Sequence, residues 1–272
     1  MPIVYTNSTG LPGPVYRVVA HNPYEKEGDF SVSELCSPPR KAHLMDTNTI
    51  TVDVKDLADS IIGNAVHSYY EGAAEEYEIV EHRLFADVDG YTISGQIDYF
   101  HPGLGWLCDW KTPSTAEWHH IKQEREDQLN VYAYLLGRNG YDVKRLTSVF
   151  TFKGYSPMKA QYGSMPPASI AQRDVEIWPT ERTEAFIRER LEMHVGRNDD
   201  TLCTDEERWI RPKYAVMKPG AKRATRVFDT EEEAVDFATE EHEIEFRAGE
   251  PVRCQFYCEA SNVCEHFQGE GL

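Results

Sequence analysis

Two carboxylates and one ammonium group lie close together near the middle of the sequence, at Asp98, Asp109 and Lys111. Asp98 ends one apolar strand pattern and Asp109 ends a second, and a His-Pro-Gly turn between them predicts a hairpin. We expect the paired strands to hold both carboxylates close enough to share a hard divalent cation such as Mg²⁺. Strand alternation places Lys111 on the same face as Asp109. This combination suits phosphodiester hydrolysis.

A predicted helix lies on each side of the hairpin in the sequence. Residues 53–74 have apolar side chains at helical spacing and carry His67, although a single helical histidine is more often structural than a ligand. Residues 116–140 predict a second helix, on which Gln128 and Tyr132 are four residues apart and therefore share one face. Their amide and phenol groups could contact a phosphate or position a water molecule.

The order of these residues resembles that of a known nuclease family. Gly63-x-x-x-His67, Gly95-x-x-Asp98, Asp109-x-Lys111 and Gln128-x-x-x-Tyr132 are similar to the motifs of the RecB-like branch of the PD-(D/E)XK nuclease superfamily. The predicted placement on helix, strand, strand and helix agrees as well. The resemblance spans the middle third of the chain.

The resemblance implies a role for each of these residues. His67, Asp98 and Asp109 would bind Mg²⁺ or Mn²⁺. Trp110, between the acid and the lysine, would offer its backbone carbonyl to the metal. Lys111 would activate water or stabilise the transition state. The expected catalytic residues are Asp98, Asp109, Lys111, Gln128 and Tyr132.

Three of the six cysteines crowd together near the C-terminal end of the sequence, at Cys254, Cys258 and Cys264. There is no signal peptide and no apolar run long enough to span a membrane, so we expect a cytoplasmic, reducing compartment without disulfides. Clustered thiols then indicate a metal. Cys108 and Cys203 have no Cys or His neighbour at ligand spacing, and we interpret them as a strand-packing thiol and an incidental one.

Cys36 is the best candidate for a fourth thiolate ligand. The arrangement resembles the iron-sulfur clasp of AddB-type and CRISPR-associated RecB-family exonucleases, which implies a 4Fe-4S cluster on Cys36, Cys254, Cys258 and Cys264. The sequence departs from that pattern, because Ser37 and Pro38 separate Cys36 from Pro39-Arg40 and because three residues lie between Cys254 and Cys258. Zn²⁺ is the alternative, since four thiolates, or three with His266, suit it equally.

The element order predicts an α/β fold, a PD-(D/E)XK (restriction-endonuclease-like) core with a mixed central sheet flanked by helices. We expect this core over 31–200 and a Cys-rich extension over 201–272 that closes onto Cys36. Glu81, in the first core strand, is expected to make an outer-shell contact at the metal. Residues 1–30 look mostly irregular. The expected strands are 79–86, 91–99, 104–110, 143–152 and 174–178, and a helix over 180–195 begins with Thr180 as its cap.

The formal net charge of −18 is unusual for a protein that binds nucleic acid. One stretch is locally basic, and its Lys-Pro-Gly turn predicts a hairpin, whereas the acidic stretch 229–250 after it predicts a solvated helix. A basic patch on an acidic body favours a threaded single strand or a DNA end over coating of duplex. The expected DNA-binding residues are Lys213, Lys218, Lys222, Arg223 and Arg226.

These observations predict a metal-dependent DNA exonuclease that acts on single strands or ends. The resemblance implies work in recombination, repair or CRISPR adaptation, with a partner protein from such a system, in a cellular or phage-encoded setting. The alternatives are a non-catalytic nuclease-fold subunit that binds DNA or a partner, an acidic DNA mimic, and a zinc-stapled endonuclease.

Overall fold

The computed structural model describes residues 3–20, 26–119, 122–163 and 165–269. The chain forms two compact units. The larger unit comprises the residues up to Ser37 together with Thr51–Arg197, and the smaller unit comprises Pro38–Ile50 together with the chain from Asn198 onward. None of the helices in these described ranges is both long enough and apolar enough to cross a lipid bilayer.

A six-stranded mixed sheet forms the centre of the larger unit. The strands follow the order β2-β5-β6-β7-β8, and β4 pairs with β5 off this path. The β2–β5 and β6–β7 pairs are parallel and the others are antiparallel, so the predicted α/β fold class is confirmed. The strands are β2 (Phe30–Ser31), β4 (Ile79–Val88), β5 (Tyr91–His101), β6 (Trp106–Lys111), β7 (Arg145–Thr151) and β8 (Ile170–Val175).

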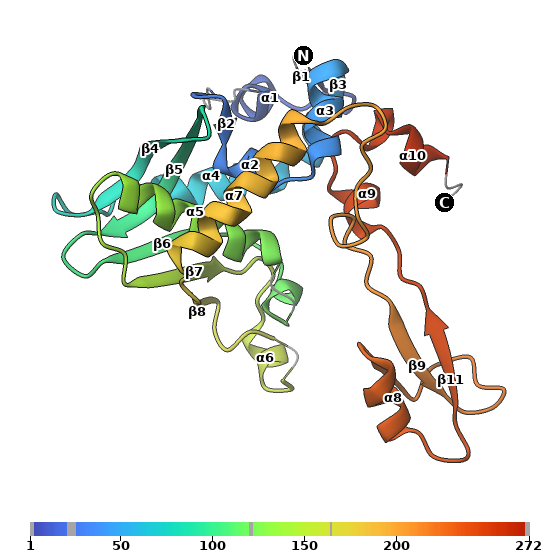
Figure 1. Ribbon diagram of the computed structural model, residues 1–272. Helices are drawn as coiled ribbons and strands as arrows, with labels where there is room; N and C mark the ends of the chain where they lie inside the picture. The colour runs from blue at the N-terminus through green and yellow to red at the C-terminus, as the bar shows by residue number, and fades with distance from the viewer. Residues whose placement is uncertain (1–2, 21–25, 120–121, 164, 270–272) are drawn as a thin grey trace. The chain divides into compact units, whose positions relative to one another are not determined.

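Helix α5 (Gln123–Arg138) lies across this sheet and contacts β4, β5, β6 and β7, and α7 (Thr180–Val195) packs on α5 (Figure 1). Leu129, Leu135 and Leu136 of α5 are fully buried between the helices and the sheet. Leu, Ile and Phe side chains from β5, β6 and β7 complete the core. The apolar face of α5 thereby fixes the helix over the strands that carry the acidic residues.

Tight turns set the register of the strands that carry the site. Asp89 and Gly90 both have positive φ, of 50° and 86°, as a two-residue hairpin turn between β4 and β5 requires. The next hairpin turns after His101, and Gly105 has φ 62° in it. The predicted strands therefore form, with bounds that differ by only a few residues from those expected.

Several predicted boundaries and elements differ from the structure. Helix α7 begins at the predicted Thr180, but its N-cap is Pro179, so the expected hydroxyl cap does not form. The described residues of the stretch 1–30 include two elements that the sequence did not predict, β1 (Ile3–Thr6), which pairs with a distant strand, β3 (Ile50–Asp53), and α1 (Gly13–Ala20). Residues 120 and 121 of the predicted helix over 116–140 lie outside the described residues.

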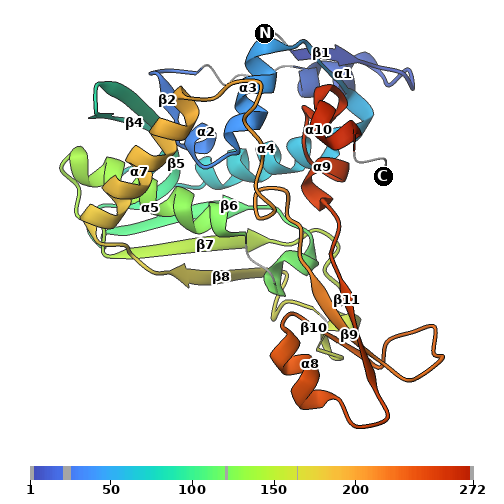
Figure 2. The same cartoon turned by 45° about the vertical axis from the view of Figure 1, so that its right-hand side comes forward.

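The smaller unit contains a three-stranded antiparallel sheet, drawn at the lower right of Figure 2 with helix α8. The predicted basic hairpin is β9 (Lys213–Met217) paired with β10 (Arg226–Phe228). The predicted acidic helix over 229–250 is wrong in its second half. Only α8 (Glu231–Phe237) is helical, and β11 (Glu243–Arg247) pairs with β9 because Ile244 and Phe246 alternate with charged residues at strand spacing.

Most of the remaining elements are short, and the 14-residue helix over Ala58–Glu71, which carries His67, is the exception. In the larger unit they are α2 (Val32–Leu35), η1 (Val54–Asp56), α4 (Ala58–Glu71), η2 (Thr115–His119) and α6 (Pro157–Ala160). In the smaller unit they are α3 (Pro39–Thr47), α9 (Val252–Phe256), η3 (Ser261–Val263) and α10 (Glu265–Gln268).

Candidate active site

Gly95 of β5 allows helix α5 to lie close to the strand that carries Asp98. A Cβ atom added at Gly95 would lie 2.7 Å from Tyr132, 2.8 Å from Val32 and 2.9 Å from Leu135. These are side-chain atoms of residues packed in the core, so a larger residue would have to displace several of them together. The glycine of the Gly95-x-x-Asp98 motif therefore has a packing role.

Asp98 and Asp109 lie next to each other on paired strands, as the sequence predicts. Each is one residue beyond the last paired positions of the hairpin, Tyr99 and Cys108. The backbone N–H of Trp110 donates a 2.6 Å hydrogen bond to Asp98 Oδ2. Both carboxylates are buried, with 9% and 2% of their surfaces exposed. The hairpin therefore holds two acids together away from bulk water.

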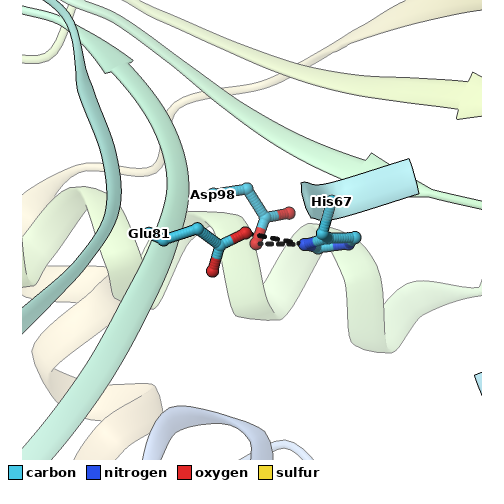
Figure 3. Close-up of side chains that lie close together, drawn as sticks. All are labelled: His67, Glu81 and Asp98. Atoms are coloured by element: carbon cyan, nitrogen blue, oxygen red, sulfur yellow. Dashed lines mark hydrogen bonds and ion pairs between the residues drawn. The ribbon is translucent and has the colours of Figure 1, made fainter. Parts of the chain in front are cut away.

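His67, Glu81 and Asp98 come together at one point (Figure 3). His67 Nδ1 lies 2.9 Å from Glu81 Oε1 and 3.6 Å from Asp98 Oδ1, and one ligand atom from each residue lies within 4.8 Å of the others. The backbone carbonyl of Trp110 lies 3.3 Å from His67 Nε2. An imidazole and two carboxylates at this spacing are suitable ligands for a divalent metal.

Glu81 takes a larger part in this cluster than the predicted outer-shell contact. Its backbone has φ 44°, which is strained for a residue with a side chain. Gln96 donates a 2.9 Å hydrogen bond to Glu81 Oε2, and Arg83 donates one of 3.1 Å to the Gln96 amide oxygen. Two neighbours thus orient the carboxylate toward His67. The spacing of the sequence motifs does not predict that the Glu81 carboxylate lies beside His67, because the backbone conformation that places it there arises only in the folded structure.

The proximity of the acids changes their ionisation. Burial, and then the charge of Asp109, raises the pKa of Asp98 to about 7, although Lys111 and His67 oppose the shift. Burial alone would lower the pKa of His67, but the hydrogen bond with Glu81 and the charge of Asp98 raise it overall. Negative charge is therefore in excess at this site, and a bound cation would relieve it.

Asp109 and Lys111 project from the same face of β6, as strand alternation predicts. Lys111 Nζ lies 2.5 Å from Asp109 Oδ1. Among the residues that the structure describes, the other oxygen, Oδ2, is buried and accepts no hydrogen bond. A buried carboxylate oxygen without a partner is costly, and a metal ion is one group that satisfies it. The residues present therefore fit a divalent metal.

Gln128 and Tyr132 lie on α5 beside the acids. The Gln128 amide donates a 2.9 Å hydrogen bond to the Tyr132 hydroxyl. Burial, followed by the charges of Asp98 and Asp109, raises the pKa of Tyr132 well above its ordinary value, so the phenol stays protonated at neutral pH. A cavity of about 200 Å³ opens against Tyr132, Asp98, Glu81 and His67. The site therefore has an accessible side on which a ligand can bind.

The sequence model of the PD-(D/E)XK nuclease superfamily matches residues 37–265. The chain belongs to this superfamily. The solved structure of SSO0001 is 16% identical and covers 65% of this chain and 83% of its own, with a TM-score of 0.45. A phage-related exonuclease from Haemophilus somnus 129PT is 13% identical and covers 66% of this chain and 74% of its own, with a TM-score of 0.31. No curated protein matches the chain.

The predicted basic residues of this nuclease fall on the β9–β10 hairpin, but they are not equivalent. Lys213 pairs with Asp229, and the Arg226 guanidinium lies over the rings of Phe228 and Phe237, 5.0 and 5.4 Å from their centroids. These two side chains therefore make contacts within the smaller unit. The exposed residues left in the turn are Lys218, Lys222 and Arg223.

The six cysteines of the nuclease are all free thiols. Cys108 is buried in β6, as expected for a packing thiol. Cys36 is the C-cap of α2 and packs against the hydrophobic core of the larger unit. Its pKa is strongly raised, by burial and then by the charge of Asp127. The other four cysteines belong to the smaller unit: Cys203, Cys254, Cys258 and Cys264.

Proposed function

We propose that this nuclease is a Mg²⁺- or Mn²⁺-dependent deoxyribonuclease of the RecB-like branch, acting as an exonuclease on single strands or DNA ends. The observation that carries the proposal is the grouping of His67, Glu81 and Asp98 beside the Asp109–Lys111 pair. An acid pair, an imidazole and an ammonium group within one buried site have the composition that phosphodiester hydrolysis requires.

The metal ligands in this proposal are His67, Glu81, Asp98 and Asp109, and the carbonyl of Trp110 lies 3.3 Å from Nε2 of His67, the ring nitrogen that does not face the two carboxylates. When bound, a divalent cation would supply Lewis-acid polarisation of the phosphate and a lowered pKa for an attacking water. The Trp110 N–H fixes one oxygen of Asp98, so the other oxygen is the one that faces His67. The protein thereby orients a carboxylate before any ligand binds.

Lys111 supplies a positive charge at the edge of the metal site. Its contact with Asp109 holds the ammonium group in place, and 21% of its side-chain surface stays exposed. An ammonium in this position can stabilise the negative charge that develops on the phosphate oxygens and can donate a proton to them. Asp109 therefore has two roles, as a ligand through one oxygen and as an anchor for Lys111 through the other.

Tyr132 and Gln128 contact the substrate in this proposal rather than the metal. A protonated phenol can donate a hydrogen bond to a phosphate oxygen, and Gln128 fixes its orientation. The exposed turn with Lys218, Lys222 and Arg223 supplies further phosphate contacts. Recombination, repair or CRISPR adaptation, with a partner protein, is the proposed setting. The 4Fe-4S cluster that the sequence predicts on Cys36, Cys254, Cys258 and Cys264 is not part of this proposal.

The proposal is tested with DNA labelled at the 5′ or the 3′ end, as single strands, blunt duplexes and covalently closed circles. Each substrate is incubated with the protein and Mg²⁺, Mn²⁺ or a chelator. We expect release of mono- or short oligonucleotides from linear DNA, no cleavage with chelator, and closed circles left intact. Cleavage of closed circles would replace the exonuclease assignment with an endonuclease, and no cleavage with either metal would contradict the enzyme assignment.

A further inference from the structure

Four cysteines line one small cavity inside the smaller unit. Cys203, Cys254, Cys258 and Cys264 surround a space of about 20 Å³, and Cys264 is buried while the other three are partly buried. Free cysteines that gather in a reducing compartment are typical of metal binding. The cavity therefore brings together a complete set of thiolate ligands within one compact unit.

Short turns of backbone bring three of these thiols together. Cys254 lies on α9, Cys258 follows in the turn, and Cys264 lies between η3 and α10. The backbone N–H of Ser261 donates to the carbonyl of Cys258, and the N–H of Cys264 donates to that of Ser261. Two consecutive turns between Cys258 and Cys264 therefore bring these thiols close together in space.

Arg40 connects the segment before Cys203 to Cys264. Its Nε donates a 3.4 Å hydrogen bond to Cys264 Sγ, and its Nη1 donates to the carbonyls of Asp199 and Thr201 at 3.0 and 2.7 Å. The arginine is buried, with 6% of its surface exposed. Arg40 thus donates a hydrogen bond to the sulfur of Cys264 and fixes the backbone just before Cys203. Hydrogen-bond donors of this kind commonly orient the ligands around a bound metal.

The charges around the cavity suit an anionic group. Three basic residues, Arg40, Lys41 and Arg253, line it together with one acid, Glu207, and Lys41 also pairs with Glu259 at 2.7 Å. Four thiolates around a dication carry a net charge of about −2, which these side chains would offset.

The smaller unit has little apolar core to stabilise it. Its buried hydrophobic side chains are few and several are alanines, whereas every member of the main hydrophobic cluster belongs to the larger unit. A small unit with such a core usually needs a metal or disulfides to fold. The buried hydrophobic residues of the smaller unit are Leu44, Ile50, Ala215, Val216, Ala234, Ala260 and Cys264.

We infer that Cys203, Cys254, Cys258 and Cys264 form a four-thiolate metal site that staples the smaller unit. Cys203 thereby takes the place that the sequence prediction gave to Cys36. The site is structural and separate from the residues proposed for DNA cleavage. Its occupant is a thiolate-binding metal group, either an iron-sulfur cluster or a zinc ion.

The spacing of the sulfur atoms bears on which group binds. In the described part of the chain, no three thiol sulfurs lie within 4.8 Å of one another. Four thiolates around one zinc ion lie roughly 3.8 Å apart, given Zn–S distances of about 2.3 Å. The thiols would have to close in to bind zinc, whereas the larger body of a cluster tolerates a wider spacing.

The test uses the full chain purified without oxygen, as wild type and as Cys203→Ala, Cys254→Ala and Cys36→Ala. Cys108→Ala serves as a matched control, because this buried thiol lies in the larger unit. Iron, sulfide and zinc per chain are measured, together with the visible absorption spectrum and the thermal unfolding temperature. Cys203→His is included, because histidine can still bind zinc or iron and rescues a ligand role but not a packing role.

We expect Cys203→Ala and Cys254→Ala to lower the metal content at least about tenfold and to lower the unfolding temperature. Cys36→Ala and Cys108→Ala should keep the full metal content, and Cys203→His should recover part of it. Iron with sulfide would identify a cluster, and zinc alone a single ion. Full metal in Cys203→Ala, loss of metal in Cys36→Ala, or a wild-type protein without either metal would overturn the assignment.

Discussion

The backbone N–H of Trp110 donates to the carboxylate of Asp98 across the β5–β6 hairpin, at 2.6 Å. This bond links the Gly95-x-x-Asp98 motif within β5 to the Asp109-x-Lys111 motif at the end of β6 and leaves the second Asp98 oxygen facing His67. The orientation of the first acid therefore depends on the backbone of the second motif. Changes at Asp98 consequently affect both metal affinity and the stability of the hairpin.

Asp98→Asn should make the metal-free protein more stable above pH 7. The folded-state pKa of Asp98 is about 7 and its ordinary value is 3.8, so between these pH values the folded state holds more protons than the unfolded state. The wild-type free energy of unfolding therefore falls as pH rises through this window. Asparagine does not ionise, so the variant does not lose this stability as pH rises. Each pKa unit of difference between the folded and unfolded states changes the free energy of unfolding by about 1.4 kcal/mol.

Urea unfolding of both proteins in chelator, at intervals from pH 4 to pH 8, measures this difference. The two curves should meet near pH 4 and separate by on the order of 4 kcal/mol at pH 8. Parallel curves would show that Asp98 ionises normally. Mn²⁺ affinity of the wild type should rise over the same window, because the metal competes with the proton.

Glu81→Gln should weaken Mn²⁺ binding at least about tenfold, because the amide loses the negative charge while it keeps the size of the side chain. Glu76→Gln is the matched control, since this acid is exposed in the preceding turn. Titration calorimetry measures both affinities. Equal affinity in the wild type and Glu81→Gln would remove Glu81 from the ligand set and return it to the outer-shell role expected from sequence.

Gly95→Ala should destabilise the fold by about 1–3 kcal/mol, because the new methyl group would overlap side chains of α5 and α2. Gly63→Ala is the control within the same family motifs. It lies inside α4, its added Cβ would meet only Thr112 at 3.7 Å, and alanine should stabilise the helix by about 0.5–1 kcal/mol. Thermal unfolding that ranks the two variants in the opposite order would disprove this packing account.

Reversing Lys218, Lys222 and Arg223 to glutamate should weaken DNA binding and flatten its salt dependence. Each lost phosphate contact should reduce the log-log slope by about 0.7 for single strands. Lys55, Arg138 and Lys144 are exposed elsewhere, and their reversal changes the net charge equally. Fluorescence anisotropy at several salt concentrations measures both triple variants. An equal effect of the two would mean that only net charge matters, and no effect would direct attention to the loop 153–171.

The sequence predicted the sheet and the acid pair well because both depend on local signals. An alternating pattern predicted β5, an apolar run predicted β6, turn residues predicted the hairpin, and strand alternation alone placed Lys111 beside Asp109. The closeness of Glu81 to His67 and Asp98 could not be predicted, because it depends on a backbone with φ 44° that no local pattern encodes. The position of Cys203 beside the three later cysteines could not be predicted for another reason. The whole segment from β9 to β11 separates it from Cys254 in sequence, so only the folded structure brings the two together.

The acidic stretch 229–250 shows that a pattern of charges alone does not predict secondary structure reliably. Three glutamates begin α8 and favour a helix start. Beyond it, β11 forms because β9 offers an edge that can pair. The sequence signal of a strand that pairs with a distant strand is weaker than that of a helix, because the hydrogen bonds of a helix lie within its own residues.

Single-turnover cleavage of end-labelled DNA by Mn²⁺-saturated wild type, Lys111→Ala and Asp109→Ala tests the central claim most directly. Calorimetry on the same samples reports metal binding. Lys111→Ala should bind Mn²⁺ as the wild type does and cleave at least about a hundredfold more slowly, because the ammonium is not a ligand but stabilises developing charge. Asp109→Ala should lose both metal affinity and cleavage. A wild type that cleaves no DNA, or a Lys111→Ala variant as fast as the wild type, would contradict the account.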